Sequence, residues 1–187
     1  MSTFRFTIET SFPSDLEILI TCNFDAPIAL VFDVFTLPEH VSKTFATNGE
    51  DFITCDIALQ VGGEYHYVMV TKEGVECSFR GTYLEVQKPQ KTVATWKFDG
   101  WPDTEAIETV ELKETDSGTE LTWSLTFTDL VGRSRMSKTD GPEANLECHG
   151  LQILRYLNES GPIFPILPCD RNTALELTCA KPSRNCV

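Results

Sequence analysis

The stretch from Cys55 to Pro89 constrains the fold of this 187-residue chain more than any other. Aromatic side chains recur at alternate positions along it, and a glycine pair, Gly62-Gly63, and a turn at Thr71–Gly74 divide it. Alternation with a period of two is typical of a β-strand that buries one face, because successive side chains point to opposite sides of the sheet. The stretch therefore predicts two long strands joined by a hairpin turn, within a curved sheet around an apolar interior.

The same alternation recurs on both sides of this hairpin. Further strands are predicted over Leu16–Phe24, Phe52–Leu59, Thr92–Phe98, Ile107–Glu114 and Glu120–Thr128. Short turns connect most of them, so neighbouring strands should run antiparallel in one sheet. The prediction is a sheet of about seven strands, with residues 1–14 forming either a short strand or an ordered arm.

Helices are predicted at two places. Two short helices follow the first strand, and Asp25 and Thr36 are the expected N-caps. From about Thr139 to Asn158 the apolar period changes to 3.6, which predicts one long amphipathic helix. A long sheet needs its apolar face covered, and only this C-terminal helix is long enough. The predicted fold class is therefore α+β, with the C-terminal helix packed across a curved antiparallel sheet around a cavity.

The composition disfavours several classes of partner. The chain has 15 Lys and Arg residues against 28 Asp and Glu residues, a net charge of −13. Phosphate backbones and anionic lipid surfaces would be repelled, so we expect no nucleic-acid partner. Without a recognisable secretory signal or an apolar run long enough for a bilayer, we expect a cytoplasmic protein with no membrane insertion. The seven cysteines lack the C-x-x-C spacing of metal and redox sites, and we expect no metal or cofactor.

Several motifs, in order along the chain, resemble a known family. They are Phe24-Asp25-Ala26-Pro27, Thr36-x-Pro38-Glu39-His40, Gly62-Gly63-x-Tyr65, Phe79-x-Gly81-x-Tyr83-x-Glu85 and Gly118-Thr119-x-Leu121-Thr122. With neighbouring matches they span roughly residues 16–158 and resemble the heat-shock-protein-90 ATPase activator homologue family. That family belongs to the START-like (SRPBCC, helix-grip, birch-pollen-allergen-like) superfamily of polyketide cyclases and lipid carriers.

The resemblance implies a helix-grip domain over residues 1–160, with 161–187 as a C-terminal extension that contains Pro and Cys. The chain departs from the family pattern at two places. Val41–Phe45 lacks the tryptophan that commonly follows the Pro-Glu-His helix, and His149-Gly150-Leu151 stands where members usually have Gly-Trp. Both segments should lie near the cavity mouth, so the ligand could differ from those of relatives.

An aromatic-lined cavity between the sheet and the C-terminal helix is the expected functional site. Its candidate wall residues are Tyr65, Tyr67, Phe79, Trp96, Phe98 and Trp123 on the sheet, and Leu146, His149 and Ile153 on the helix. Tyrosine and tryptophan combine an apolar body with a hydrogen-bond donor, which suits a partly polar guest. The alternative is that these side chains simply pack as core.

Candidates for acid–base chemistry are few. His149 is the weak candidate for a catalytic residue, because it lies at the edge of the helix's apolar stripe and titrates near neutrality. The simpler interpretation is a histidine that faces solvent. The acidic residues of the last hairpin, Glu105, Glu108, Glu111, Glu114 and Glu120, are interpreted as its solvated face.

Three functions are compatible with the sequence. The first is binding of a hydrophobic or aromatic small molecule in the cavity. The second is a cyclase or isomerase type of enzyme, acting on a polyketide-like or other reactive metabolite by acid–base chemistry in the pocket. The third is a chaperone ATPase-activator-like interaction module, which implies a chaperone contact. The sequence does not decide whether the protein is an enzyme.

Overall fold

The structure is a computed structural model that describes residues 8–45 and 50–138. Its elements, in chain order, are β1 (Ile8–Ser11), β2 (Glu17–Phe24), α1 (Ile28–Thr36), α2 (Pro38–Thr44), β3 (Asp51–Ile57), β4 (Glu64–Val70), β5 (Glu76–Gln87), β6 (Lys91–Phe98), β7 (Glu105–Thr115), β8 (Gly118–Phe127) and α3 (Leu130–Lys138). None of the helices in this described part is long and apolar enough to cross a membrane.

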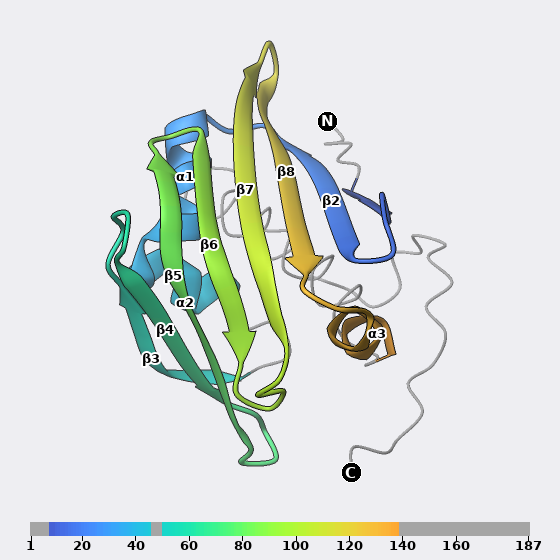
Figure 1. Cartoon of the computed structure of the whole chain (residues 1–187). Helices are drawn as coiled ribbons and strands as arrows, with labels where there is room; N and C mark the ends of the chain where they lie inside the picture. Colours follow the sequence, from blue (N-terminus) through green and yellow to red (C-terminus); the bar gives the residue numbers. More distant parts are fainter. Residues whose placement is uncertain (1–7, 46–49, 139–187) are drawn as a thin grey trace, which may run out of the picture.

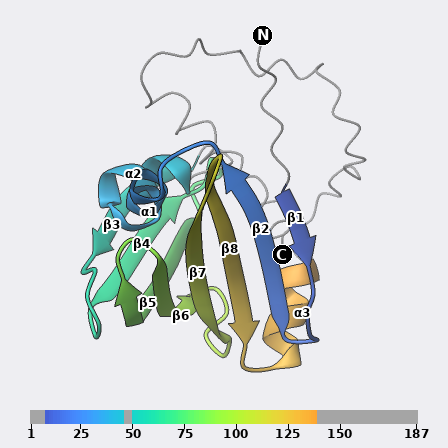
Figure 2. The ribbon, with the colours of Figure 1, turned by 90° about the horizontal axis from the view of Figure 1, so that it is seen from above.

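The strands form one sheet in the order β1-β2-β8-β7-β6-β5-β4-β3 (Figure 1). Each described strand pairs antiparallel with its neighbours. The sheet is strongly curved and is not closed into a barrel, and α1 and α2 pack together against one of its faces (Figure 2). We call this face the inner face. The predicted α+β class with a curved antiparallel sheet is therefore confirmed.

In the part of the chain that the structure describes, the sheet has eight strands rather than seven. All seven predicted strands are present, and the additional strand is β1, which pairs with β2 from Ile8 opposite Cys22 to Ser11 opposite Leu19. β1 has only four residues, too few for alternation to distinguish a strand from an ordered arm. Its Ile8 packs against the buried cluster under α1, which explains why this short segment joins the sheet.

The predicted helix caps are wrong. The N-cap of α1 is Pro27 rather than Asp25, and the N-cap of α2 is Leu37 rather than Thr36. Thr36 instead ends α1, where its buried hydroxyl donates a 2.7 Å hydrogen bond to the carbonyl oxygen of Phe32. A buried threonine hydroxyl bonded to the carbonyl four residues earlier is satisfied inside the helix, so it does not cap the next one.

Helix α3 was not predicted. It follows β8 directly, beside the end of that strand (Figure 1). The carboxylate oxygen Oδ1 of Asp129 accepts hydrogen bonds from the backbone N–H groups of Val131 and Gly132, at 2.7 and 2.8 Å. Asp129 thus satisfies the first free donors of the helix, a cap signal present in the sequence. The long helix predicted over 139–158 and the extension over 161–187 lie outside the described residues.

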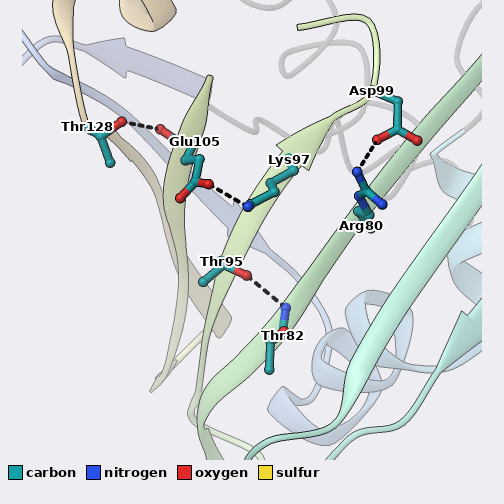
Figure 3. Close-up of polar contacts among 7 residues, drawn as sticks. All are labelled: Arg80, Thr82, Thr95, Lys97, Asp99, Glu105 and Thr128. Carbon is teal, nitrogen blue, oxygen red and sulfur yellow. Dashed lines mark hydrogen bonds and ion pairs between the residues drawn. The ribbon is translucent and has the colours of Figure 1, made fainter. Parts of the chain in front are cut away.

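The two faces of the sheet differ in polarity. The inner face of β2, β7 and β8 packs against α1 through buried side chains such as Val31, Val110 and Leu121. The opposite face is polar, and Figure 3 shows part of it: Arg80 pairs with Asp99 at 2.9 Å, and Lys97 pairs with Glu105. The alternation of side chains therefore separates an apolar inner face from a charged outer face.

Candidate functional site

A row of residues across the inner face explains where a cavity forms. Leu125 on β8, Glu108 on β7, Ala94 on β6 and Tyr83 on β5 are successive neighbours in the strand register. Neighbours in such a row lie about 5 Å apart. Because Ala94 has the smallest side chain of the four, it leaves a space between Glu108 and Tyr83.

This space is a cavity of about 40 Å³ between the inner face and the two N-terminal helices. The sheet residues that line it are Tyr65, Tyr67, Phe79, Tyr83, Thr92, Ala94, Trp96, Glu108, Val110 and Trp123. Helices α1 and α2 contribute Val34, Phe35 and Val41, and the C-cap position of α2 contributes Phe45. A volume of about 40 Å³ can hold a few water molecules or a small chemical group.

Aromatic rings surround the cavity in contact with one another. The ring centroids of Tyr65 and Tyr67 lie 4.9 Å apart, and those of Tyr65 and Tyr83 lie 5.8 Å apart. From the helices, Phe45 lies 5.6 Å from Tyr67, and Phe35 meets Trp123 edge-on at 6.0 Å. Edge-to-face and tilted pairs at these distances are favourable, so the contacts between the rings stabilise the wall of the cavity.

Glu108 is the one carboxylate among the described residues that line the cavity. Its atom Oε1 accepts a 2.8 Å hydrogen bond from the indole Nε1–H of Trp123. The two residues are diagonal neighbours on adjacent strands, because Trp123 lies opposite Val110, and Glu108 lies opposite Leu125. The indole therefore fixes the carboxyl group in place on the inner face.

The environment of Glu108 changes its proton affinity. Burial raises the pKa of this carboxyl group from 4.5 to about 7, and the hydrogen bond from Trp123 partly opposes the rise. A carboxyl group with a pKa near 7 can either accept or donate a hydrogen bond at neutral pH, and it can transfer a proton. Within the described part of the chain, no group of three or more His, Cys, Asp or Glu side chains is placed to hold a metal ion.

Three tyrosines complete the polar part of the site. The Tyr65 hydroxyl donates a 3.1 Å hydrogen bond to the carbonyl oxygen of Thr95. Burial, with the nearby charge of Glu108, raises the pKa values of Tyr65, Tyr67 and Tyr83 well above the ordinary value, so the phenols stay neutral. The described residues thus bring together one carboxyl group, three phenols and an indole N–H.

Gly81 allows Tyr65 to reach this position. A Cβ atom at Gly81 would lie 1.8 Å from the Thr95 carbonyl oxygen and 2.6 Å from the ring atom Cε1 of Tyr65. Such distances are far shorter than any non-bonded contact, so the ring can cross β5 only over a glycine. The hydrogen bond from Tyr65 to Thr95 depends on that crossing.

The structure places five of the six aromatic residues named from the sheet, Tyr65, Tyr67, Phe79, Trp96 and Trp123, around this cavity. Phe98 is absent from the described lining and instead stacks on Phe79, with ring centroids 4.9 Å apart. It also meets Trp101 edge-on at 5.2 Å. Leu146, His149 and Ile153 lie outside the described residues.

The interpretation of Glu108 as part of a solvated face is wrong. Glu105, Glu111 and Glu114 are exposed, whereas Glu108 lies on the inner face and lines the cavity. The signal was present in the sequence, because Ala106, Glu108, Val110 and Leu112 alternate along β7, and the three apolar members are buried. Because alternate residues of a strand lie on the same face, Glu108 is expected on the inner face with these three apolar residues.

A search among curated proteins finds no match for this chain. Among solved structures, a protein from Rhodobacter sphaeroides matches with a TM-score of 0.75 at 17% identity, covering 83% of this chain and all of the other. A protein from Nitrosomonas europaea matches at 0.71 and 22% identity, covering 79% and 97%. A protein from Aeromonas hydrophila, described as AHSA1-like, matches at 0.60 and 18% identity, covering 76% and 92%. Similarity at these identities establishes the shared fold.

The open, curved antiparallel sheet with α1 and α2 against its inner face is consistent with the START-like, helix-grip class of proteins. Residues 25–147, more than half of the chain, match the family described as "Activator of Hsp90 ATPase homolog 1-like protein". The chain belongs to that family. The resemblance of its motifs to the heat-shock-protein-90 ATPase activator homologues is thus confirmed.

Proposed function

We propose that this protein binds a small, largely apolar molecule that carries one polar group, in the cavity between the inner face and helices α1 and α2. The observation that carries the proposal is the position of Glu108, a half-buried carboxyl group that lines the cavity within an aromatic wall. Burying a polar group that packing does not require costs free energy, so its presence favours a role in recognising a ligand.

The size of the cavity sets a condition on binding. Small-molecule sites usually enclose about 300–1,000 Å³. The described cavity, at about 40 Å³, accommodates only the polar end of such a molecule. A larger ligand requires movement of Phe35 and Phe45, which cover the cavity from short helices rather than from the sheet.

A filled-cavity variant tests this proposal. Ala94→Val would add two methyl groups to the cavity, while Val93→Ile on the same strand enlarges a side chain of the opposite face. Native mass spectrometry of the purified protein should detect a bound small molecule in the wild type and in Val93→Ile, but less in Ala94→Val. Screening small apolar compounds by thermal shift supplies the same comparison when no molecule copurifies. Equal binding by both variants would count against the cavity as the site.

A second candidate function is proton transfer, as in a cyclase or isomerase. It is supported by a carboxyl group with a pKa of about 7 beside three neutral phenols, since an acid–base catalyst works best near the ambient pH. The earlier candidate, His149, lies outside the described residues. Turnover that persists unchanged in Glu108→Gln would remove Glu108 from such a mechanism.

Chaperone activation is the third candidate, and the family description alone supports it. Fold membership does not transfer function, so we rank it below the two cavity functions. A pull-down with the chaperone at low ionic strength tests it, and no retention would count against it.

A further inference from the structure

We propose that the polar group bound beside Glu108 is a primary ammonium group, so that the ligand is a small amphipathic amine. This inference rests on the proposed function and gives the chemical class of the ligand. It follows from the free oxygen of Glu108, the charge of the lining, the aromatic faces and the size of the cavity.

The carboxyl group of Glu108 has capacity for a further partner. Its Oε1 atom accepts the indole hydrogen bond, and among the described residues no hydrogen bond reaches Oε2. A buried carboxylate normally has two or more hydrogen-bond partners or a cation beside it. Oε2 is therefore the atom of Glu108 that can accept a hydrogen bond from a ligand.

The charge of the residues that line the cavity determines whether a cationic or an anionic ligand is favoured. No lysine, arginine or histidine is among the described residues that line the cavity, so none of these residues supplies a counter-ion to Glu108. An anionic group would face the carboxylate without compensation, at a large cost in free energy. An ammonium group would supply the counter-ion and up to three N–H donors.

The aromatic rings favour a cation for an independent reason. The faces of tyrosine and tryptophan rings attract cations within about 6 Å of the ring centroid. Tyr65, Tyr67 and Tyr83 form a mutually packed group on one side of the cavity, and Trp96 and Trp123 also line it. The site thus combines a carboxylate with several electron-rich aromatic rings.

The volume of the cavity distinguishes primary from quaternary amines. A space of about 40 Å³ admits an ammonium group with one or two carbon atoms, whereas a trimethylated ammonium group is larger. Only the primary group can also donate a hydrogen bond to Oε2. We therefore assign the primary amine.

Binding of an amine should depend on pH through Glu108. Among the described residues, the other titratable groups that line the cavity are Tyr65 and Tyr67 on β4 and Tyr83 on β5, and burial raises their pKa values. The Cys55 thiol on β3 lies opposite Tyr67 in the strand register, and burial raises its pKa as well. α1 and α2 present apolar side chains to the cavity. Affinity for the amine should rise as the pH rises through 7, because the ionised carboxylate binds the cation.

Three probes of matched shape test the inference. Propylammonium, 1-propanol and propionate can be titrated into the full-length protein and followed by NMR at the Trp123 indole N–H, assigned by its loss in Trp123→Phe. At pH 8 we expect propylammonium to bind at least about tenfold more tightly than 1-propanol, and propionate to cause no shift. In Glu108→Gln the preference for the amine should fall to less than about threefold.

A control variant and the remaining outcomes complete the test. Glu114→Gln removes the same charge from an exposed position of the same strand and should keep the full preference for the amine. If 1-propanol binds as tightly as propylammonium, the assignment of an amine ligand is overturned, and the proposed binding function stands. If none of the three probes shifts the Trp123 signal or any other lining residue, both are overturned.

Discussion

The indole N–H of Trp123 is hydrogen-bonded to a carboxyl group, that of Glu108, which lies on the inner face of the neighbouring strand. The Trp123 side chain therefore both lines the cavity and donates a hydrogen bond. The pair provides the most direct ways to test the site, since each partner can be changed with little loss of volume.

The stability of the protein should fall as the pH rises from about 4.5 to 7. Burial raises the pKa of Glu108 to about 7 in the folded state, so the folded chain retains a proton that the unfolded chain releases. This loss of stability is absent at pH values below the pKa of Glu108 in the unfolded chain. It is complete at pH values above the pKa of Glu108 in the folded protein. It amounts to at most about 3 kcal/mol. Urea unfolding at pH 5 and pH 8 should show this difference in the wild type and a smaller one in Glu108→Gln, while Glu114→Gln should behave as the wild type.

Trp123→Phe should raise the pKa of Glu108 further. The indole hydrogen bond stabilises the ionised carboxyl group, so its loss favours the protonated form. Carboxyl-carbon NMR of Glu108 measures the titration midpoint directly. Trp101→Phe, which changes an indole outside the described lining, serves as the control. A midpoint that moves down in Trp123→Phe would contradict the assigned hydrogen bond.

Gly81→Ala should destabilise the sheet by about 3 kcal/mol or more, because overpacking of this severity forces the backbone to shift. The new Cβ would overlap the Thr95 carbonyl oxygen and the Tyr65 ring. Gly74→Ala is the useful comparison: no atom lies within 4 Å of a Cβ there, and only the φ of +81° opposes it, at about 1 kcal/mol. Chemical unfolding of the two variants gives the ranking, and equal losses would argue against the close approach at Gly81.

Phe45→Ala should enlarge the cavity and create a site for benzene. Truncating a phenylalanine costs about 3 kcal/mol and leaves an apolar space. Phe45 contacts Tyr67 and Phe79 over the cavity. Benzene should raise the melting temperature of Phe45→Ala more than that of Phe98→Ala, a truncation outside the described lining. The reverse order would place the cavity elsewhere.

Much of the sheet could be predicted because its strands alternate so regularly. Leu121, Trp123, Leu125 and Phe127 alternate along the strand predicted over Glu120–Thr128, and all four are buried. β1 was uncertain, since four residues carry too little periodicity. α3 was missed because its sequence has almost no apolar face, and Asp129 was its only clear signal.

The candidate site was predicted less completely than the sheet. Tyr65 and Tyr67 follow from alternation alone. Glu108 was assigned to the solvent because it belongs to a series of glutamates, although its parity matches Val110. Phe35 and Phe45 contribute to the lining through the way two short helices pack on the sheet, which no local pattern specifies. The cavity itself depends on Ala94 being small beside two larger neighbours, a relationship visible only once the strands are in register.

The half-buried carboxyl group of Glu108 also bears on how this protein could be engineered. Replacing Glu108 with leucine or methionine should make the fold more resistant to heat, since an apolar side chain of similar volume would replace a partly desolvated carboxyl group that has no counter-ion among the described lining residues. A search for thermostable variants would therefore select against the residue to which we assign ligand recognition. Natural proteins commonly show this opposition between stability and activity. In this protein it is concentrated in one side chain in the middle of β7.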